Sequence, residues 1–228
     1  MNLIEAIQRR HSVRQYLDRP IPEEITLRLQ AAIEACNRVG NLHMQLVLEE
    51  PEAFSGIRAK AMKFKGVQNY IIVAGEKDDT LDERCGYYGE KVVLLAQQLG
   101  LNTCWVGATY KKQPEFYTLE PGEKVIIAIA IGYGANQGKP RKSKSMCDVS
   151  DGTEVSLTVP DWYKRGVSAA MLAPTALNQQ RFHFERIGNV VALEAGKGPF
   201  TKVDLGIVRC HFEIGAGKDN FQWMPEDE

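Results

Sequence analysis

The chain has 228 residues, 44% of them hydrophobic and 25% charged, with a net charge of −1. This composition is typical of a globular domain with a core, and the near-zero charge excludes a strong attraction to nucleic acid or anionic lipid. No apolar run approaches the ~20 residues of a membrane span, and an acid stands where a secretion signal carries bases, so we expect a cytoplasmic protein.

The spacing of apolar residues predicts helices and strands through the first half of the chain. A helix should begin at Pro22, because proline and the acids after it favour a first turn. The almost wholly apolar run at 125–131 predicts a strand buried on both faces. In chain order we expect a helix at 3–10, an extended segment at 16–21, a helix at 22–37, strands at 44–48 and 70–74, a helix at 87–99 ended by Gly100, and the strand at 125–131.

The second half opens with a polar loop that is rich in glycine, lysine and serine, as connecting loops are. Two short strands there flank Gly188-Asn189, which is typical of a tight hairpin turn. In chain order we expect the loop at 134–151, a helix at 161–172 that stops before Pro174, strands at 182–186 and 190–194, and a last helix at 204–215.

The two halves also resemble each other weakly, which predicts an internal repeat. The segment that begins Ala35-Cys36-Asn37 parallels the one that begins Ala173-Pro174-Thr175, and Gly89 parallels Gly206. We therefore expect a single domain over 1–228, built from pseudo-repeats at approximately 1–150 and 151–228. Chance similarity of two helix-and-turn segments is the alternative explanation.

Cysteine and histidine patterns predict no metal site. The five cysteines are widely spaced without a Cys-x-x-Cys pair, so we expect reduced, mostly buried thiols. His183-x-Glu185 and His211-x-Glu213 resemble part of a deaminase zinc site, but no Pro-Cys-x-x-Cys follows them. The chain also lacks the Gly-x-Gly-x-x-Gly of a Rossmann nucleotide site.

A basic cluster closes the first predicted helix. Arg10, Ser12 and Arg14 should point to one side if the chain leaves the helix in extended form. Two guanidinium groups and a hydroxyl on one side can grip a phosphate, because the planar fork pairs bidentately with phosphate oxygens. A second basic patch, Lys139 to Lys142, could hold the same phosphate. A solvated turn and a solubilising loop are the alternative readings.

Two further segments have the chemistry to contact a flat heteroaromatic ligand. Gly100 to Ala108 ends in small residues, which let a backbone N–H approach a ring closely. Pro174 to Gln180 carries Asn and Gln amides, which offer both donors and acceptors to a ring edge. An ordinary helix-to-strand turn and helix capping are the alternatives.

Together these segments resemble the FMN-binding motifs of the nitroreductase family. Arg10-His11-Ser12-x-Arg14 is similar to its N-terminal signature, and Lys139-Pro140-Arg141 to its late Lys-x-Arg phosphate contact. Residues 100–107 resemble its Gly-Leu-Gly-Thr-Cys-Trp-Ile-Gly segment, and residues 173–180 its Ala-Pro-Ser-x-x-Asn-x-Gln-Pro-Trp motif. Arg181-Phe182 stands where the family has Pro-Trp.

The resemblance implies an α+β fold, in which helices flank a central, mostly antiparallel sheet. Family members are usually homodimers that bind FMN between subunits, with the Arg-His-Ser segment from one and the Pro-Ser-x-x-Asn segment from the other. Here residues 35–41 have lost the proline that residues 173–180 keep. The resemblance therefore implies an internal pseudo-dimer of the single-chain TM nitroreductase branch, a monomer or weak homodimer with one FMN. The implied FMN contacts are Arg10, His11, Ser12, Arg14, Gly107, Ala108, Lys139 and Arg141 from the first half, and Pro174, Thr175, Ala176 and Asn178 from the second.

The implied activity is that of an FMN-dependent oxidoreductase. Hydride from NADH or NADPH would pass through the flavin to a small acceptor such as a nitroaromatic or a quinone, with the chemistry carried by the cofactor. No residue is assigned as an obligatory acid or base, although Lys63 or Lys65 could stabilise the reduced flavin and Gln180 could contact the ring. A flavin-binding sensor or carrier without turnover is the alternative, as is an enzyme of this fold that removes halogen or cleaves flavin.

Overall fold

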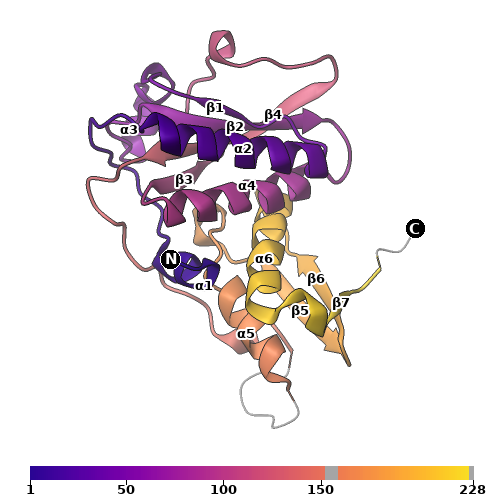
Figure 1. Ribbon diagram of the computed structural model, residues 1–228. Coiled ribbons are helices and arrows are strands. Elements are labelled where there is room, and N and C mark those ends of the chain that lie inside the picture. The colour runs from indigo at the N-terminus through magenta and orange to yellow at the C-terminus, as the bar shows by residue number, and fades with distance from the viewer. Residues whose placement is uncertain (152–158, 226–228) are drawn as a thin grey trace.

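A four-stranded sheet and a three-stranded sheet occupy opposite ends of the molecule, with helices crossing between them (Figure 1). The computed structural model describes residues 1–151 and 159–225. Within these residues the helices are α1 (Leu3–Arg9), α2 (Glu23–Gly40), α3 (Ile57–Ala61), α4 (Leu81–Gln98), α5 (Asp161–Ala170) and α6 (Thr201–Ala216). None of them is both long enough and apolar enough to cross a membrane.

The larger sheet has the strand order β1-β2-β4-β3, and each neighbouring pair is antiparallel. Alternate residues of its central strands face two separate cores: Ile71 and Val73 pack toward α2 and α4, whereas Tyr70 and Ile72 face the segment around α3. In β4 the neighbours Ala128 and Ile129 likewise belong to the two different cores, which confirms the burial on both faces predicted for residues 125–131. The strands are β1 (Gln45–Val47), β2 (Asn69–Glu76), β3 (Asn102–Val106) and β4 (Glu123–Gly132).

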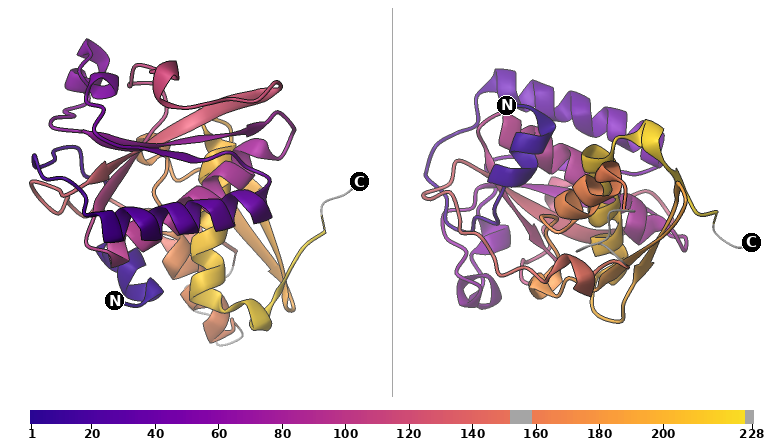
Figure 2. Two further views of the ribbon diagram at one scale, coloured as in Figure 1. Left: turned by 45° about the horizontal axis from the view of Figure 1, so that its top comes forward. Right: turned by 90° about the horizontal axis from the view of Figure 1, so that it is seen from below.

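The smaller sheet contains the expected hairpin and one strand that we did not expect. Strands β5 (Phe182–Ile187) and β6 (Val190–Ala195) pair antiparallel, and Gly188-Asn189 forms the turn between them, as predicted. Strand β7 (Gln222–Trp223) pairs parallel to β6. Two residues are too few to show an alternating pattern in the sequence, which is why β7 was not foreseen. Figure 2 shows these C-terminal elements gathered on one side of the larger sheet.

Helices α4 and α6 cross with their backbones in direct contact at two glycines. A Cβ atom built on Gly86 would lie 2.0 Å from the carbonyl oxygen of Val203. One built on Gly206 would lie 1.9 Å from the carbonyl oxygen of Glu83. Only glycine permits such an approach of two main chains. The crossing is therefore fixed by these two residues, and it joins the first half of the chain to the second.

Several element bounds differ from those predicted. Helix α4 begins at Leu81 rather than at 87, because Asp82 and Glu83 favour the first turn through the helix dipole. Residues 102–106, for which no strand was predicted, form strand β3 at the edge of the larger sheet. Helix α3 was not predicted, since five residues carry too little periodicity. Of the cysteines, Cys85, Cys104 and Cys210 are buried as free thiols.

Helix α1 places the start of the basic cluster in the interior. A capping box between Asn2 and Glu5 begins the helix, and its buried face packs against α4, α5 and α6. Arg10 is the C-cap residue, and its extended backbone turns the chain toward β3. Ser12 then pairs with Thr103 in a parallel bridge, so that residues 12–16 run along the edge of the larger sheet.

Candidate functional site

Arg10 is buried where the two halves of the chain meet. Only 5% of its side chain is exposed, and burial lowers the pKa of its guanidinium group. Its Nη2 donates to the carbonyl oxygen of Leu172 at 3.5 Å, at the end of α5. Its Nε lies 3.7 Å from Oε1 of Glu90 but has no hydrogen-bond partner. A buried guanidinium N–H without an acceptor is costly, so this site favours an additional acceptor.

Glu90 connects Arg10 to three other elements. This carboxylate in α4 is fully buried, and Nε2 of His211 in α6 lies 2.8 Å from its Oε1. Nε1 of Trp105 in β3 donates to its Oε2 at 2.9 Å. The other ring nitrogen of His211 lies 3.1 Å from the carbonyl oxygen of Ala169 in α5. One buried carboxylate therefore holds together groups from α1, α4, β3 and α6.

Arg141 brings a second guanidinium group to the same place. Its Nη2 donates to the carbonyl oxygen of Met171, next to the residue that Arg10 contacts. The pKa of Arg141 is lowered to about 10, mainly by burial and to a smaller extent by the charge of Arg10. The pKa of His11 is also lowered, by burial and then by Arg10 and Arg141. Three basic groups thus lie close enough to repel each other, which favours an anion among them.

The remaining residues of the basic cluster surround the thiol of Cys104. Burial raises the pKa of this thiol, and Arg14, a hydrogen bond from Ser12 and Arg10 act in the opposite direction. Arg10, Ser12 and Arg14 therefore all lie near this thiol in β3. Lys139 is exposed, and Gly138 before it packs directly against His11 and Ser12. Both basic segments thus lie side by side.

The loop of residues 173–180 is held in place by Asp204 near the start of α6. The carboxylate of Asp204 accepts hydrogen bonds from the backbone N–H of Ala176 at 2.9 Å and from Nε2 of Gln179 at 2.7 Å. Burial raises the pKa of Asp204 to about 6, although these hydrogen bonds and Arg141 oppose the shift. Pro174 is buried just after α5. It lies three positions after Met171, whose carbonyl oxygen accepts a hydrogen bond from Arg141.

A second set of contacts ties this loop to the long loop that carries Arg141. Nδ2 of Asn178 and Nε2 of Gln180 both donate to the carbonyl oxygen of Lys142, at 2.9 and 3.1 Å. Oε1 of Gln180 accepts from the backbone N–H of Lys144 at 3.0 Å, and the hydroxyl of Thr175 accepts from the N–H of Gln180. The amide of Gln180 is therefore hydrogen-bonded on both its oxygen and its nitrogen within the protein.

Several residues in and near this loop have strained backbone angles. Leu177, Asn178, Gln180 and Phe200 all adopt positive φ angles between 47° and 58°. Such angles are uncommon for residues other than glycine, and they cluster at binding sites where the surrounding structure enforces them. Leu177 is the clearest case, because its apolar side chain is 82% exposed on this strained backbone.

The small residues after β3 face the second half of the chain. A Cβ atom on Gly107 would lie 2.5 Å from the ring of Phe200, so the ring covers the glycine backbone directly. Ala108, the next residue, is exposed. Lys63 and Lys65 are exposed on the other side of the basic segment. Lys65 pairs with Gln15 in a parallel bridge, and Lys63 has a φ angle of 65°.

Sequence reasoning found the segments of this site but missed the residues that join them. Glu90, His211, Asp204 and Phe200 were not assigned any role there. Glu90 had one usable signal, since a carboxylate among Val92, Val93 and Leu94 lies on the buried face of its helix. A buried carboxylate requires partners, and these are His211, Trp105 and the charge of Arg10.

The family comparison covers almost the whole chain. The family model described as "Putative TM nitroreductase" matches residues 2–216. None of the curated proteins compared with the chain matches it.

Solved structures of the same fold include proteins from several bacteria. A "putative nitroreductase" from Thermotoga maritima has a TM-score of 0.68 and 24% identity, covering 96% of this chain and 85% of that one. NfrA1 nitroreductase from B. subtilis has a TM-score of 0.53 and 15% identity, covering 68% and 76%. A nitroreductase in complex with FMN from Desulfovibrio desulfuricans has a TM-score of 0.50 and 18% identity, covering 65% and 94%. At these identities the likeness shows the α+β nitroreductase fold alone.

Proposed function

The chain belongs to the TM nitroreductase family, and we propose from this membership and from its buried basic site that it is an FMN-dependent oxidoreductase. Hydride from NADH or NADPH would reach a small acceptor such as a nitroaromatic or a quinone. A relative solved in complex with FMN supports the choice of cofactor. The observation that carries the proposal is the meeting of Arg10 and Arg141 at the end of α5.

The donor set fits the phosphate of FMN. Arg10 keeps a buried Nε without an acceptor, and Arg141 is half-buried next to it. Among the residues that the structure describes, Glu90 is the one ion-pair partner of these two guanidinium groups, which leaves a local excess of positive charge. A dianionic phosphate would balance that excess with charge-assisted hydrogen bonds. His11, Ser12 and Lys139 line the same side and would complete the phosphate contacts.

The ring of the flavin would lie between the two halves. A backbone N–H at Gly107 or Ala108 would face it from the first half, and Pro174, Thr175, Ala176 and Asn178 would border it from the second. Arg14 would help Arg10 and Arg141 to neutralise the phosphate. When bound, FMN supplies the hydride-accepting and hydride-donating centre, so the protein's own task is to hold, orient and shield it. We assign no residue as an obligatory acid or base.

We also propose that the chain is an internal pseudo-dimer. Gly86 contacts the carbonyl of Val203, and Gly206 contacts the carbonyl of Glu83. Gly86 stands three positions after Glu83, which Gly206 contacts. Gly206 stands three positions after Val203, which Gly86 contacts. The crossing of α4 and α6 is therefore reciprocal. Such reciprocity is the signature of a two-fold interface, and it pairs Gly206 with Gly86 rather than with Gly89 as the sequence comparison suggests. The pseudo-repeats would thus be 1–150 and 151–228, although residues 152–158 and 226–228 lie outside the described residues.

The reciprocal position to the proposed FMN loop is filled by protein. Nη1 of Arg84 donates to the carbonyls of Gly40 and Asn41 at the end of α2, as Asp204 binds the loop after α5. A Cβ atom on Gly40 would lie 2.4 Å from the ring of Tyr88, so this ring closes the space. We therefore propose one FMN per chain, in a cytoplasmic protein that is a monomer or a weak homodimer.

The test of turnover is anaerobic addition of NADH or NADPH to the FMN-loaded protein. We expect the visible flavin absorbance to bleach, and then to recover when a nitroaromatic or quinone is added. A flavin that stays oxidised with both donors would favour a sensor or carrier instead. Release of halide or breakdown of the flavin would point to the other chemistries of this fold.

The test of the phosphate assignment is Arg10→Ala. Loss of a charge-assisted bond should weaken FMN binding by about 1.5–3 kcal/mol, measured by fluorescence titration. Arg9→Ala is the matched control, since Arg9 is an exposed neighbour of equal charge. Unchanged FMN affinity in folded Arg10→Ala protein would show that the phosphate assignment is wrong.

A further inference from the structure

His211 in α6 is fully buried, and each of its ring nitrogens faces an oxygen. Nε2 lies 2.8 Å from Oε1 of Glu90, and Nδ1 lies 3.1 Å from the backbone carbonyl oxygen of Ala169. A carbonyl oxygen and an ionised carboxylate accept hydrogen bonds but cannot donate them. A neutral imidazole has a single N–H and could satisfy only one of these two oxygens. Both contacts are made when both nitrogens of His211 carry a proton, which gives the ring a positive charge.

The surroundings of Glu90 favour a proton on His211 rather than on the carboxylate. Nε1 of Trp105 donates to Oε2 of Glu90 at 2.9 Å, and Nε of Arg10 lies 3.7 Å from Oε1. A nearby cation and donated hydrogen bonds stabilise the ionised form of a carboxylic acid. A charge that is paired and hydrogen-bonded in this way can be retained in a protein interior. The geometry therefore gives Glu90 a negative charge and His211 a positive one.

Glu90 lies closer to His211 than to Arg10. Its Oε1 is 2.8 Å from the imidazole nitrogen but 3.7 Å from Nε of Arg10, and that Nε has no hydrogen-bond partner. Because the attraction between two charges falls with distance, the carboxylate pairs mainly with His211. The guanidinium of Arg10 then keeps its positive charge and an unused N–H in a buried position, which is what a phosphate oxygen requires.

The two halves of the chain differ at the positions of this pair. With the two glycines of the helix crossing taken as equivalent, Glu90 in α4 corresponds to Cys210 in α6. Burial raises the pKa of the Cys210 thiol, so it carries no charge. By the same shift His211 corresponds to Lys91, an exposed residue whose ammonium lies over a tyrosine ring. The carboxylate and the imidazole thus accompany the proposed phosphate site, and neither is kept at the position that Tyr88 fills.

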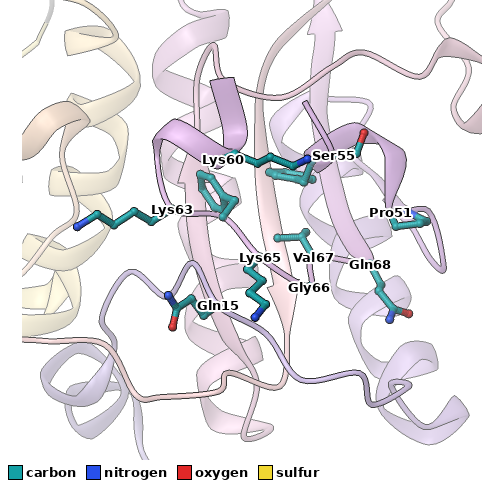
Figure 3. Close-up of a pocket in the computed structure, with 11 residues that line it drawn as sticks. Gln15, Pro51, Ser55, Lys60, Lys63, Lys65, Gly66, Val67 and Gln68 are labelled. Carbon is teal, nitrogen blue, oxygen red and sulfur yellow. The ribbon is translucent and has the colours of Figure 1, made fainter. Parts of the chain in front are cut away.

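A second basic region of the molecule has a different arrangement. Lys60, Lys63 and Lys65 line a surface depression beside α3. Figure 3 shows their ammonium groups pointing in three different directions, so they do not converge on one anion. Arg10 and Arg141, in contrast, donate to the carbonyl oxygens of two consecutive residues at the end of α5. The convergent charges are therefore the buried ones.

From these contacts we infer that His211 is a positioning residue for the phosphate of FMN. As an imidazolium it neutralises Glu90, and so it leaves the charge of Arg10 to bind the phosphate. Without this positive charge, Glu90 would pair with Arg10 and compete with the phosphate. The inference rests on the proposed function, because it takes FMN as the ligand of Arg10.

The test compares the binding of FMN and of riboflavin to the full chain freed of flavin, by fluorescence titration. Riboflavin has the same ring without the phosphate, so the ratio of the two dissociation constants reports on the phosphate alone. The variants are His211→Gln, and His211→Gln combined with Glu90→Gln, which removes the carboxylate as well. In the second substitution the glutamine oxygen can still accept from Trp105. Lys60→Gln is the control, since it removes one positive charge from the depression beside α3.

We expect FMN to bind the wild type and Lys60→Gln on the order of a hundredfold more tightly than riboflavin. In His211→Gln this preference should fall on the order of tenfold, because Glu90 then pairs with Arg10. The combined variant should regain most of the preference, because no carboxylate is left to compete for Arg10. A combined variant with a preference below that of His211→Gln would show a purely structural role and overturn the inference.

A second measurement needs no substitution at His211. Nitrogen NMR of the holoprotein with isotope-labelled histidine should show an imidazolium ring for His211 at neutral pH. The signals of the other three histidines are identified by replacing each of them in turn. A neutral ring, or an unchanged FMN preference in folded His211→Gln, would overturn the inference alone. Equal binding of FMN and riboflavin to the wild type would overturn the phosphate site of the proposed function, and the inference with it.

Discussion

Replacing Gly86 with alanine should separate the two helices that hold the molecule together. The new methyl group would start 2.0 Å from the carbonyl oxygen of Val203, and it must move to at least 3.0 Å. The obstacle is main chain in α6, which cannot rotate away as a side chain could. Overpacking of this kind costs about 1–3 kcal/mol. Alanine in a helix interior gains about 0.5–1 kcal/mol over glycine, so we expect a net loss of about 1–2 kcal/mol.

The assay is equilibrium unfolding in urea, followed by circular dichroism with FMN present in constant excess. Gly206→Ala should behave like Gly86→Ala, because its methyl group meets the carbonyl oxygen of Glu83 at 1.9 Å. One separation of α4 and α6 relieves both clashes. The double variant should therefore lose less than the sum of the two single losses, as is usual for residues in one contact.

Gly56→Ala is the control, since a Cβ atom there meets nothing within 4 Å. It should change the free energy of unfolding by less than about 1 kcal/mol. A gain in stability for Gly86→Ala would refute the reasoning, because it would mean that propensity outweighs the clash. Fully additive losses in the double variant would refute the idea that a single helix movement relieves both contacts.

Four further results are expected. Glu90→Gln should lower the free energy of unfolding by about 3 kcal/mol in urea denaturation, because it leaves Arg10 buried without its counter-charge; a loss below about 1 kcal/mol would show that the pair is dispensable. Asp204 has its pKa raised to about 6, so the folded state holds a proton that the unfolded state releases between pH 4 and 6. Stability should therefore fall by up to about 3 kcal/mol as pH rises through this range, and Asp204→Asn should remove that dependence. Arg141→Ala should weaken FMN binding by about 1.5–3 kcal/mol in fluorescence titration, whereas Lys142→Ala, which loses an exposed lysine next to it, should not. Absorbance of the denatured holoprotein should give one FMN per chain, and a value of two would contradict the closure of the second position by Tyr88.

Much of the fold could be predicted because its signals are local. The apolar runs in β2 and β4, the turn at Gly188-Asn189 and the acidic start of α2 each involve residues within one element. Hydrogen-bonded turns and side-chain periodicity act over the same short distance. The elements that escaped prediction, α3, β3 and β7, are five, five and two residues long and carry too few side chains to form a pattern.

The candidate site was predictable in its parts but not in its assembly. Arg10, Ser12 and Arg14 form a recognisable cluster, and so do Pro174 and Asn178, because each group lies within a few positions of the chain. Their meeting depends on contacts between residues far apart: Arg10 and Leu172 are 162 positions apart, and His211 and Glu90 are 121. No periodicity in the sequence encodes such a pair.

By itself, the sequence therefore determined the basic and amide segments, the strands of the sheet and the resemblance to a family. The tertiary structure decided that Glu90 lies under Arg10, that Phe200 covers Gly107 and that Tyr88 covers Gly40. These outcomes follow from the crossing of α4 and α6 at two glycines, since the distance of closest approach sets which side chains meet on either side of it. Local residue patterns determine which helices and strands form, whereas the packing of the two halves determines which side chains come into contact.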